Sequence, residues 1–205
     1  MFLLKQIFDN GESLLGIRKI DSDENQLTGY CSLNDVDNVI LNDCSSVERR
    51  LEILNVRALI KDLGLDLKIT YKHRKPIANF GKISISHSDS LVAVIWSKSF
   101  EYAIDIEEVA ERITRISKRA FSNSELEFAE GNLIKLNLMW NCKESVYKIA
   151  ENKGLSFKEQ IRVHPFADDK KIMCEMIIEN EKSFFEFEYG MLENHTFVYG
   201  KVKTD

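Results

Sequence analysis

Short stretches in which apolar and polar residues alternate make up much of the chain, and they predict β-strands. The alternation is clear over residues 67–71, 83–86 and 102–106, where every second side chain points to the same face of a strand. Residues 91–96 form an unbroken apolar run, which is typical of a buried strand. The first 45 residues alternate only weakly and predict short strands and loops.

A helical period replaces the alternation after residue 45. Ser45 and Glu48 have the spacing of a capping box, which predicts a helix with Ser45 as its N-cap and Gly64 at its C-terminus. Four apolar residues fall on one stripe of this helix, and three cations fall on another. The apolar stripe is Val47, Leu51, Leu54 and Ala58, and the basic stripe is Arg50, Arg57 and Lys61.

The second half of the chain changes from helices to strands. A second capping box lies at residues 122–125, and a longer helix is predicted over residues 133–152, closed by Gly154. The alternating segments of the tail predict antiparallel strands. Each half therefore holds a helix and several strands. We expect an α+β fold with two lobes of similar size, residues 1–98 and 99–205.

Composition and charge narrow the class of protein. The chain has 205 residues, of which 44% are hydrophobic, so a folded chain is expected rather than a disordered one. A membrane-spanning helix needs about 20 apolar residues, and the longest run here is far shorter. The apolar stretch at the N-terminus is too short for a signal peptide. A net charge of −5 argues against nucleic-acid binding, which needs an excess of cations.

The four cysteines do not form a recognisable site. Cys31, Cys44, Cys142 and Cys174 are too far apart in the sequence for a zinc knuckle or a redox motif. We therefore expect reduced thiols and a cytoplasmic protein, with neither a membrane nor a nucleic acid as its partner.

Two acidic residues on a predicted strand are the sharpest chemical feature. Asp105 and Glu107 point to the same side of the strand, while Ile104 and Ile106 point into the core. Neighbouring carboxylates repel each other unless a cation or a proton lies between them. Mg²⁺ prefers such oxygen ligands and completes its shell with phosphate oxygens and water. The pair therefore indicates a Mg²⁺ site, although a solvated acidic edge has the same pattern.

A second feature lies on the long predicted helix. Trp140, Glu144 and Lys148 are spaced at i, i+4 and i+8, so they share one face. Glu144 is then a candidate third carboxylate for the metal, and Lys148 is a candidate phosphate partner. An ordinary Glu–Lys pair beside an aromatic core residue has the same spacing.

The third feature is the polar end of a predicted strand, Ser86-His87-Ser88. A histidine at a strand end can donate to a phosphate oxygen, with hydroxyl groups beside it. A histidine that is merely exposed at the surface is the alternative.

Four segments occur together in one order: Lys75-Pro76, Ser86-His87-Ser88, Asp105-Ile106-Glu107 and the helix from Trp140 to Lys148. In this ordered set the chain resembles the 4′-phosphopantetheinyl transferase superfamily, in particular its longer, single-chain Sfp-type members. The resemblance covers about residues 47–163. It implies a pseudo-twofold α+β fold, in which each lobe packs a long helix on a small antiparallel sheet and coenzyme A binds in the cleft between the lobes.

The resemblance also implies a reaction. The 4′-phosphopantetheine arm of coenzyme A would pass to a serine of an apo acyl or peptidyl carrier protein, releasing adenosine 3′,5′-bisphosphate. Asp105, Glu107 and Glu144 would hold Mg²⁺ against the pyrophosphate. Glu144 would also remove the serine proton, and Lys148 would offset the charge that develops in the transition state.

The first lobe would supply the contacts to coenzyme A. By the same resemblance, three of its residues would contact the phosphates and the nucleotide, and an arginine of the predicted helix would reach the 3′-phosphate. The three residues are Lys75, Ser86 and His87, and the arginine is Arg49, Arg50 or Arg57.

A basic stripe follows the acidic strand and predicts a docking surface for an acidic carrier. It holds Arg112, Arg115 and Arg119 at i, i+3 and i+7, with Lys118 adjacent. A monomer is expected, because one chain carries both lobes. Two alternatives remain: a Mg²⁺-dependent phosphohydrolase or nuclease that uses the same carboxylates, and a catalytically silent relative that only binds coenzyme A or a carrier.

Overall fold

The computed structural model describes residues 2–73, 75–150, 154–167 and 170–202. Over these residues the protein is an α+β chain with three antiparallel sheets and six α-helices, which confirms the α+β part of the prediction. The chain divides into two compact units, Met1–Tyr102 and Ala103–Asp205. Within the described part of the chain, no helix combines the length and the apolar character that crossing a membrane would require.

The first unit is built on a four-stranded antiparallel sheet in the order β1-β2-β6-β5. Its strands are β1 (Phe2–Phe8), β2 (Ser13–Lys19), β5 (Lys82–His87) and β6 (Leu91–Ser97), and the 3₁₀ turn η1 (Asp9–Gly11) joins the first two. All seven residues of β6 are buried, as its apolar run predicts. The hairpin of β3 (Ile69–Lys72) and β4 (Lys75–Ala78) forms a separate two-stranded sheet.

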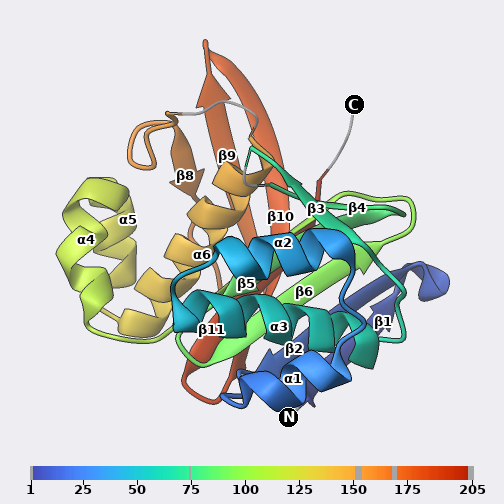
Figure 1. Ribbon diagram of the computed structural model, residues 1–205. Coiled ribbons are helices and arrows are strands. Elements are labelled where there is room, and N and C mark those ends of the chain that lie inside the picture. Colours follow the sequence, from blue (N-terminus) through green and yellow to red (C-terminus); the bar gives the residue numbers. More distant parts are fainter. Residues whose placement is uncertain (1, 74, 151–153, 168–169, 203–205) are drawn as a thin grey trace. The chain divides into compact units, whose positions relative to one another are not determined.

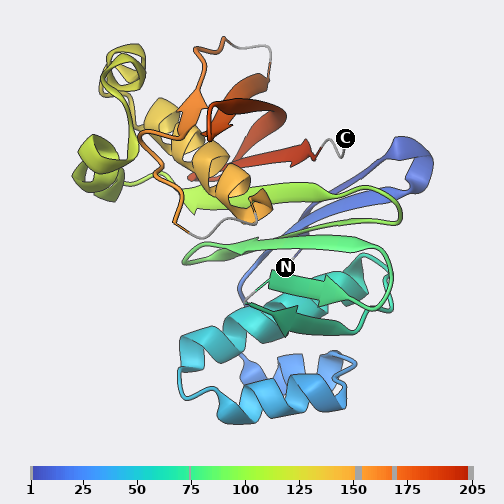
Figure 2. The ribbon, with the colours of Figure 1, turned by 90° about the horizontal axis from the view of Figure 1, so that it is seen from above.

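The helix α3 (Val47–Asp62) packs against this four-stranded sheet. Leu59 and Leu63 share a core cluster with Val92 of β6. Gly16 of β2 permits the close approach, because a Cβ atom there would lie only 2.9 Å from side-chain carbons of Leu59 and Leu63. Figure 2 shows α3 between the sheet and two shorter helices.

These two shorter helices, α1 (Glu24–Tyr30) and α2 (Asp35–Asp43), correct the expectation that the first 45 residues hold only short strands and loops. The side chains of Asp23 and Asn34 cap their N-termini, and both helices contribute to a core cluster with α3. A helix of two turns has too few apolar residues for its period to stand out in the sequence.

The two ends of α3 test two predictions. Ser46, and not Ser45, is the N-cap, and its Oγ accepts a hydrogen bond from the backbone N–H of Arg49 at 3.2 Å. The neighbouring serines have the same capping chemistry, so their spacing did not decide between them. Gly64 ends the helix as predicted: its φ is +79°, and its N–H donates to the carbonyl of Lys61 at 2.9 Å.

The second unit is built on a five-stranded antiparallel sheet in the order β7-β11-β10-β9-β8. The strands are β7 (Tyr102–Glu108), β8 (Ile161–Val163), β9 (Lys171–Ile178), β10 (Glu181–Leu192) and β11 (His195–Lys201). The helix α6 (Leu133–Ile149) lies across one face of this sheet, as Figure 1 shows. Cys142 and Val146 of α6 share a core cluster with Cys174 and Phe187 of the sheet.

Two short helices, α4 (Arg112–Ala120) and α5 (Asn123–Ala129), precede α6. The predicted capping box at the start of α5 is confirmed: Ser122 accepts from the backbone of Glu125, and the Glu125 side chain accepts from the backbone of Ser122. The predicted end of α6 is wrong, because the helix ends at Ile149 with Ala150 as its C-cap. Residues 151 and 152, which the prediction also included, lie outside the described residues.

Candidate functional site

The alternation on β7 places two carboxylates on the side of the strand that faces α6. Ile104 and Ile106 are fully buried, as predicted. Asp105 contacts Lys148 of α6, and Glu107 accepts a hydrogen bond from the Trp140 side chain of the same helix. The acidic pair and the helix motif therefore form one group in the second unit.

Two buried asparagines fix α6 against the backbone of β7. The side-chain amide of Asn137 donates to the carbonyl oxygen of Glu107 at 3.1 Å, and that of Asn141 donates to the carbonyl oxygen of Asp105 at 3.2 Å. Both also hydrogen-bond to Thr196 of β11. Neither asparagine was predicted as a functional residue, although both precede Glu144 and Lys148 at the spacing of one helix face.

Each of the two β7 carboxylates lies beside a cation of its own unit. Lys148 Nζ is 2.7 Å from Asp105 Oδ1 and 3.0 Å from the carbonyl oxygen of Ile104. Arg112 Nη2, on the first turn of α4, is 3.2 Å from Glu107 Oε2. Asp105 is 3% exposed but the Lys148 side chain is 31% exposed, so the contact is shielded from water on one side and is stronger than a fully exposed pair.

Burial and mutual repulsion set the protonation of the other two carboxyl groups. Burial is the main cause that raises the pKa of Glu107 to about 7; the charge of Asp105 adds to it, while Arg112, Trp140 and Lys148 oppose it. Burial likewise raises the pKa of Glu144 to about 7, again with a contribution from Asp105. The three side chains therefore lie close enough to resist carrying three negative charges together.

The donor chemistry of this group fits a hard divalent cation. All three side chains offer carboxylate oxygens, and a divalent ion would relieve the repulsion that raises the pKa values of Glu107 and Glu144. As the described residues stand, no three acidic, histidine or cysteine side chains converge closely enough to hold a metal ion. Lys148 and Arg112 instead provide the positive charge at Asp105 and Glu107.

A buried ion pair anchors α6 at Lys143, the residue before Glu144. Lys143 is fully buried, and its Nζ lies 2.9 Å from Glu125 Oε1. The same ammonium donates to the carbonyl oxygens of Phe157 and Ile161, at 2.7 and 2.5 Å. The ring of Phe157 in turn packs against Trp140, with 5.3 Å between ring centroids. Lys143, for which the sequence predicts no role, thus ties α5, α6 and the start of β8 together.

In the first unit, the end of β5 carries a small exposed cluster. Glu52 of α3 accepts from Arg49 Nη1 at 2.7 Å and lies 3.3 Å from His87 Nδ1. The other ring nitrogen of His87, Nε2, is 3.1 Å from Arg49 Nη1. Ser86 beside it is buried. The structure thus brings His87 together with Arg49, one of the three arginines that the sequence analysis considered.

The other two arginines have partners elsewhere in the first unit. Arg57 is 5% exposed, and its Nε donates to Asp37 Oδ1 of α2 at 2.7 Å. Arg50 Nε donates to Glu24 of α1 at 2.9 Å. Of the basic stripe predicted for α3, Arg50 and Arg57 are therefore engaged by α1 and α2, whereas Lys61 is exposed. Lys75 is exposed at the start of β4.

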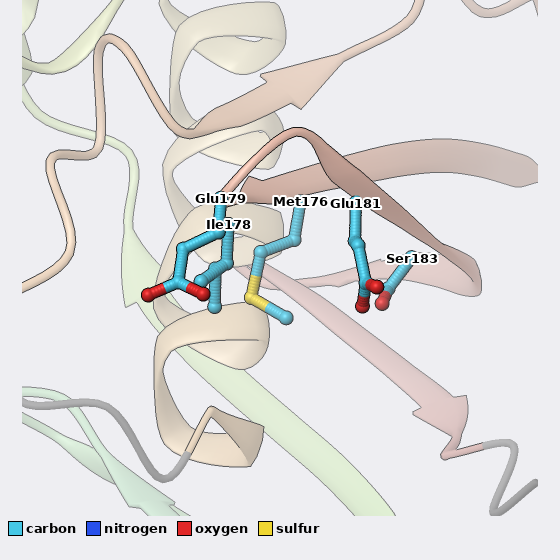
Figure 3. Close-up of a pocket in the computed structure, with 5 residues that line it drawn as sticks. All are labelled: Met176, Ile178, Glu179, Glu181 and Ser183. Atoms are coloured by element: carbon cyan, nitrogen blue, oxygen red, sulfur yellow. The ribbon is translucent and has the colours of Figure 1, made fainter.

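A pocket of about 320 Å³ lies at the tip of the β9–β10 hairpin, and Figure 3 shows the side chains that line it. The lining residues are Met176, Ile178, Glu179, Glu181 and Ser183. None of them belongs to the predicted site, and the two carboxylates there have no cation among the lining residues. This pocket therefore does not take part in the chemistry considered above.

In comparisons with known proteins, no protein-family model and no curated protein sequence matches this chain.

Proposed function

We propose that the protein transfers the 4′-phosphopantetheine arm of coenzyme A to a serine of an apo acyl or peptidyl carrier protein, with Mg²⁺ as its cofactor. The observation that carries the proposal is the meeting of Asp105 and Glu107 on β7 with Glu144 and Lys148 on α6. These residues belong to the segments in which the chain resembles the 4′-phosphopantetheinyl transferase superfamily. Carboxylates beside a lysine suit transfer at a phosphorus atom that is surrounded by anionic oxygens.

In this proposal Asp105, Glu107 and Glu144 hold the metal ion. Bound Mg²⁺ would neutralise pyrophosphate oxygens and so lower the repulsion that opposes nucleophilic attack. Lys148 places a second positive charge at Asp105, with its Nζ 2.7 Å from the carboxylate. That ammonium would stabilise the charge that moves onto the leaving group.

Glu144 is the proposed base for the acceptor serine. Its pKa of about 7 leaves a large part of the carboxyl group ionised at neutral pH. The serine oxygen forms a bond to the phosphorus that carries the pantetheine arm, and Glu144 takes the hydroxyl proton. The bond from that phosphorus to the bridging pyrophosphate oxygen breaks, and its electron pair leaves with adenosine 3′,5′-bisphosphate.

The proposed contacts of the first unit to coenzyme A centre on His87. Arg49 and His87 are both about half exposed and share Glu52 as their anion, so a phosphate group could replace that carboxylate as their partner. Ser86 and Lys75 are included on the resemblance alone. Arg50 and Arg57 are left out, since their guanidinium groups are engaged by Glu24 and Asp37.

We also propose that the two units are similar lobes and that the protein is a monomer of the cytoplasm. Each unit packs a long helix, α3 or α6, on an antiparallel sheet, which supports a pseudo-twofold pair of similar lobes. The four cysteines are free thiols, which suits the reducing cytoplasm. We propose a cytoplasmic monomer, because a single chain carries both sets of residues.

The carrier is proposed to dock on the basic face of α4. Arg115, Lys118 and Arg119 of this helix are exposed, and within the described part of the chain none of the three forms an ion pair. Acidic carriers would therefore meet cations that form no ion pair with the described residues of this chain.

Intact-mass spectrometry of an apo carrier protein, incubated with this protein, coenzyme A and Mg²⁺, tests the proposed reaction. We expect a mass gain of one phosphopantetheine arm. The gain should disappear with EDTA and in Asp105→Ala. The matched control is Glu108→Gln, which removes the next carboxylate along β7 and should leave the transfer unchanged.

Two results would contradict the proposal in different ways. Release of inorganic phosphate without any gain in carrier mass would indicate a phosphohydrolase. Binding of coenzyme A without transfer to acyl or peptidyl carriers would indicate a catalytically silent relative.

A further inference from the structure

Arg112 differs from the other cations of α4 because it contacts the acidic group on β7 and α6. Its Nη2 lies 3.2 Å from Glu107 Oε2 in the candidate metal group. Arg115, Lys118 and Arg119 are exposed and have no ion-pair partner among the described residues. One helix therefore carries both a cation that contacts a metal carboxylate and a row of cations that face solvent.

A metal ion and the Arg112 guanidinium would compete for the same carboxylate. Two like charges a few ångströms apart repel each other, so a divalent ion on Glu107 would weaken the hold of Arg112. The Arg112 side chain is 47% exposed, against 27% for Glu107, so the arginine can turn to solvent without opening the core. The Trp140 hydrogen bond to Glu107 does not depend on Arg112 and would keep the carboxylate in place.

We propose that Arg112 couples the docking of an acidic protein on α4 to metal binding at Glu107. Carboxylates of a docked partner would attract Arg112 away from Glu107 and leave Glu107 open to the metal. The coupling is reciprocal: the factor by which the partner tightens metal binding is the factor by which the metal tightens partner binding. The inference rests on the proposed function, because that function supplies both the metal and the acidic carrier.

The cation beside Asp105 is Lys148, and its position explains why the coupling is assigned to Arg112 instead. Lys148 belongs to α6 and is 31% exposed, and its ammonium also donates to the carbonyl oxygen of Ile104. A partner docked on α4 would not draw Lys148 away from Asp105, because Lys148 belongs to a different helix. Arg112 alone among the cations near these carboxylates lies on the proposed docking helix.

The test measures Mn²⁺ affinity of the full chain by electron paramagnetic resonance of the free ion, with and without an apo acyl carrier protein. The acceptor serine of the carrier is changed to alanine, so that no transfer takes place. For the wild type we expect the carrier to tighten Mn²⁺ binding about fivefold or more, the lower range of allosteric coupling. Arg112→Gln should bind Mn²⁺ several-fold more tightly without a carrier, and the carrier should then add no further change.

Arg119→Gln is the matched control, because it removes one cation from the same helix without touching Glu107. It should weaken carrier binding but leave the Mn²⁺ affinity of the carrier-free protein at the wild-type value. Equal changes in both variants would overturn the inference, since they would show a general effect of net charge. An unchanged Mn²⁺ affinity in Arg112→Gln would also overturn the inference.

Failure of the proposed function gives a different result. If neither the wild type nor Arg112→Gln binds Mn²⁺, the metal assignment itself is wrong and the inference falls with it. If Arg112→Gln transfers phosphopantetheine normally and its Mn²⁺ affinity is unchanged, the function stands and only the coupling is rejected.

Discussion

At the scale of single residues, burial decides the chemistry of the acidic group on β7 and α6. Asp105 is shielded from water and lies beside Lys148. Glu107 and Glu144 are partly buried near the same negative charge, and this raises the pKa of each to about 7. Lys148 therefore stabilises the first carboxylate by direct contact, whereas the cations near the other two only partly oppose the burial and repulsion that raise their pKa values.

The stability of the metal-free protein should fall as the pH rises from about 4.5 to about 7. Glu107 and Glu144 have higher pKa values in the folded chain than their ordinary value of 4.5. Their contribution to stability is therefore complete below that ordinary value and is lost as both groups ionise. We expect a loss of about 2 kcal/mol for each, allowing for solvent screening. Thermal melts in EDTA at several pH values measure it.

Two comparisons check the origin of this pH dependence. Glu144→Gln should flatten the profile by roughly half, because glutamine does not ionise. Mg²⁺ should restore stability to the wild type at about pH 8 and have little effect on Glu144→Gln. A wild-type profile that is flat between about pH 5 and pH 8 would show that folding does not raise the pKa values of Glu107 and Glu144.

The arginines of α3 should separate into a binding residue and structural residues. Arg49→Ala should raise the KM for coenzyme A about tenfold with little change in kcat, because it would remove binding common to the ground and transition states. Arg57→Ala should instead lower the free energy of unfolding by about 3 kcal/mol, because it leaves Asp37 buried without its cation. Steady-state kinetics and urea denaturation distinguish the two. A higher KM in a stable Arg57→Ala variant would contradict this division.

At the scale of elements, polar contacts fix the position of α6 as much as apolar packing does. Asn137 and Asn141 join the helix to β7, and Lys143 joins it to α5 and to the segment before β8. Each of these three side chains donates to a defined acceptor, so a shift of the helix by one residue would break several hydrogen bonds together. The positions of Glu144 and Lys148 follow from this register.

The buried pair Lys143–Glu125 should be essential to stability. Lys143→Met leaves Glu125 buried without its cation and should cost about 3–5 kcal/mol in the free energy of unfolding. The matched control is Lys171→Met, whose partner Glu186 lies on the exposed side of the β9–β10 pair, and it should cost less than about 1 kcal/mol. Urea denaturation measures both. Similar costs for the two variants would show that burial does not set the strength of the Lys143 pair.

At the scale of the whole molecule, a net charge of −5 contrasts with the basic face of α4. An acidic carrier would be repelled by most of the protein and attracted at this helix. Such an arrangement steers the orientation of docking more than it raises affinity. It also makes docking sensitive to salt, because exposed charges are screened within about 10 Å at 0.1 M ionic strength.

Charge reversal on α4 should therefore raise the KM for the carrier. Arg115→Glu with Arg119→Glu should raise it about tenfold at low salt, with the KM for coenzyme A unchanged, and the difference should shrink as salt is added. The matched control reverses Lys82 and Lys98, two exposed cations of the first unit. If the control pair has the same effect, the carrier responds to net charge and α4 is not its docking surface.

Local patterns predicted much of the fold and of the acidic group. The period of two at residues 104–107 predicted that Asp105 and Glu107 would share a face, and the spacing along α6 predicted the same for Glu144 and Lys148. Ser122 and Glu125 predicted the start of α5. Each of these features depends on the geometry of one strand or one helix, which the sequence specifies through its own repeat.

Only the tertiary structure decided which of the predicted side chains remain available. The period of α3 places Arg50 and Arg57 on one stripe but does not show that they are engaged, because their partners Glu24 and Asp37 lie on helices too short to be recognised from their pattern. The contacts of Asn137, Asn141 and Lys143 likewise need strands that are distant in the sequence. The chain by itself determines which face of an element is polar. Packing against other elements determines whether that face is buried, paired or open to a ligand, because those partners come from distant parts of the sequence.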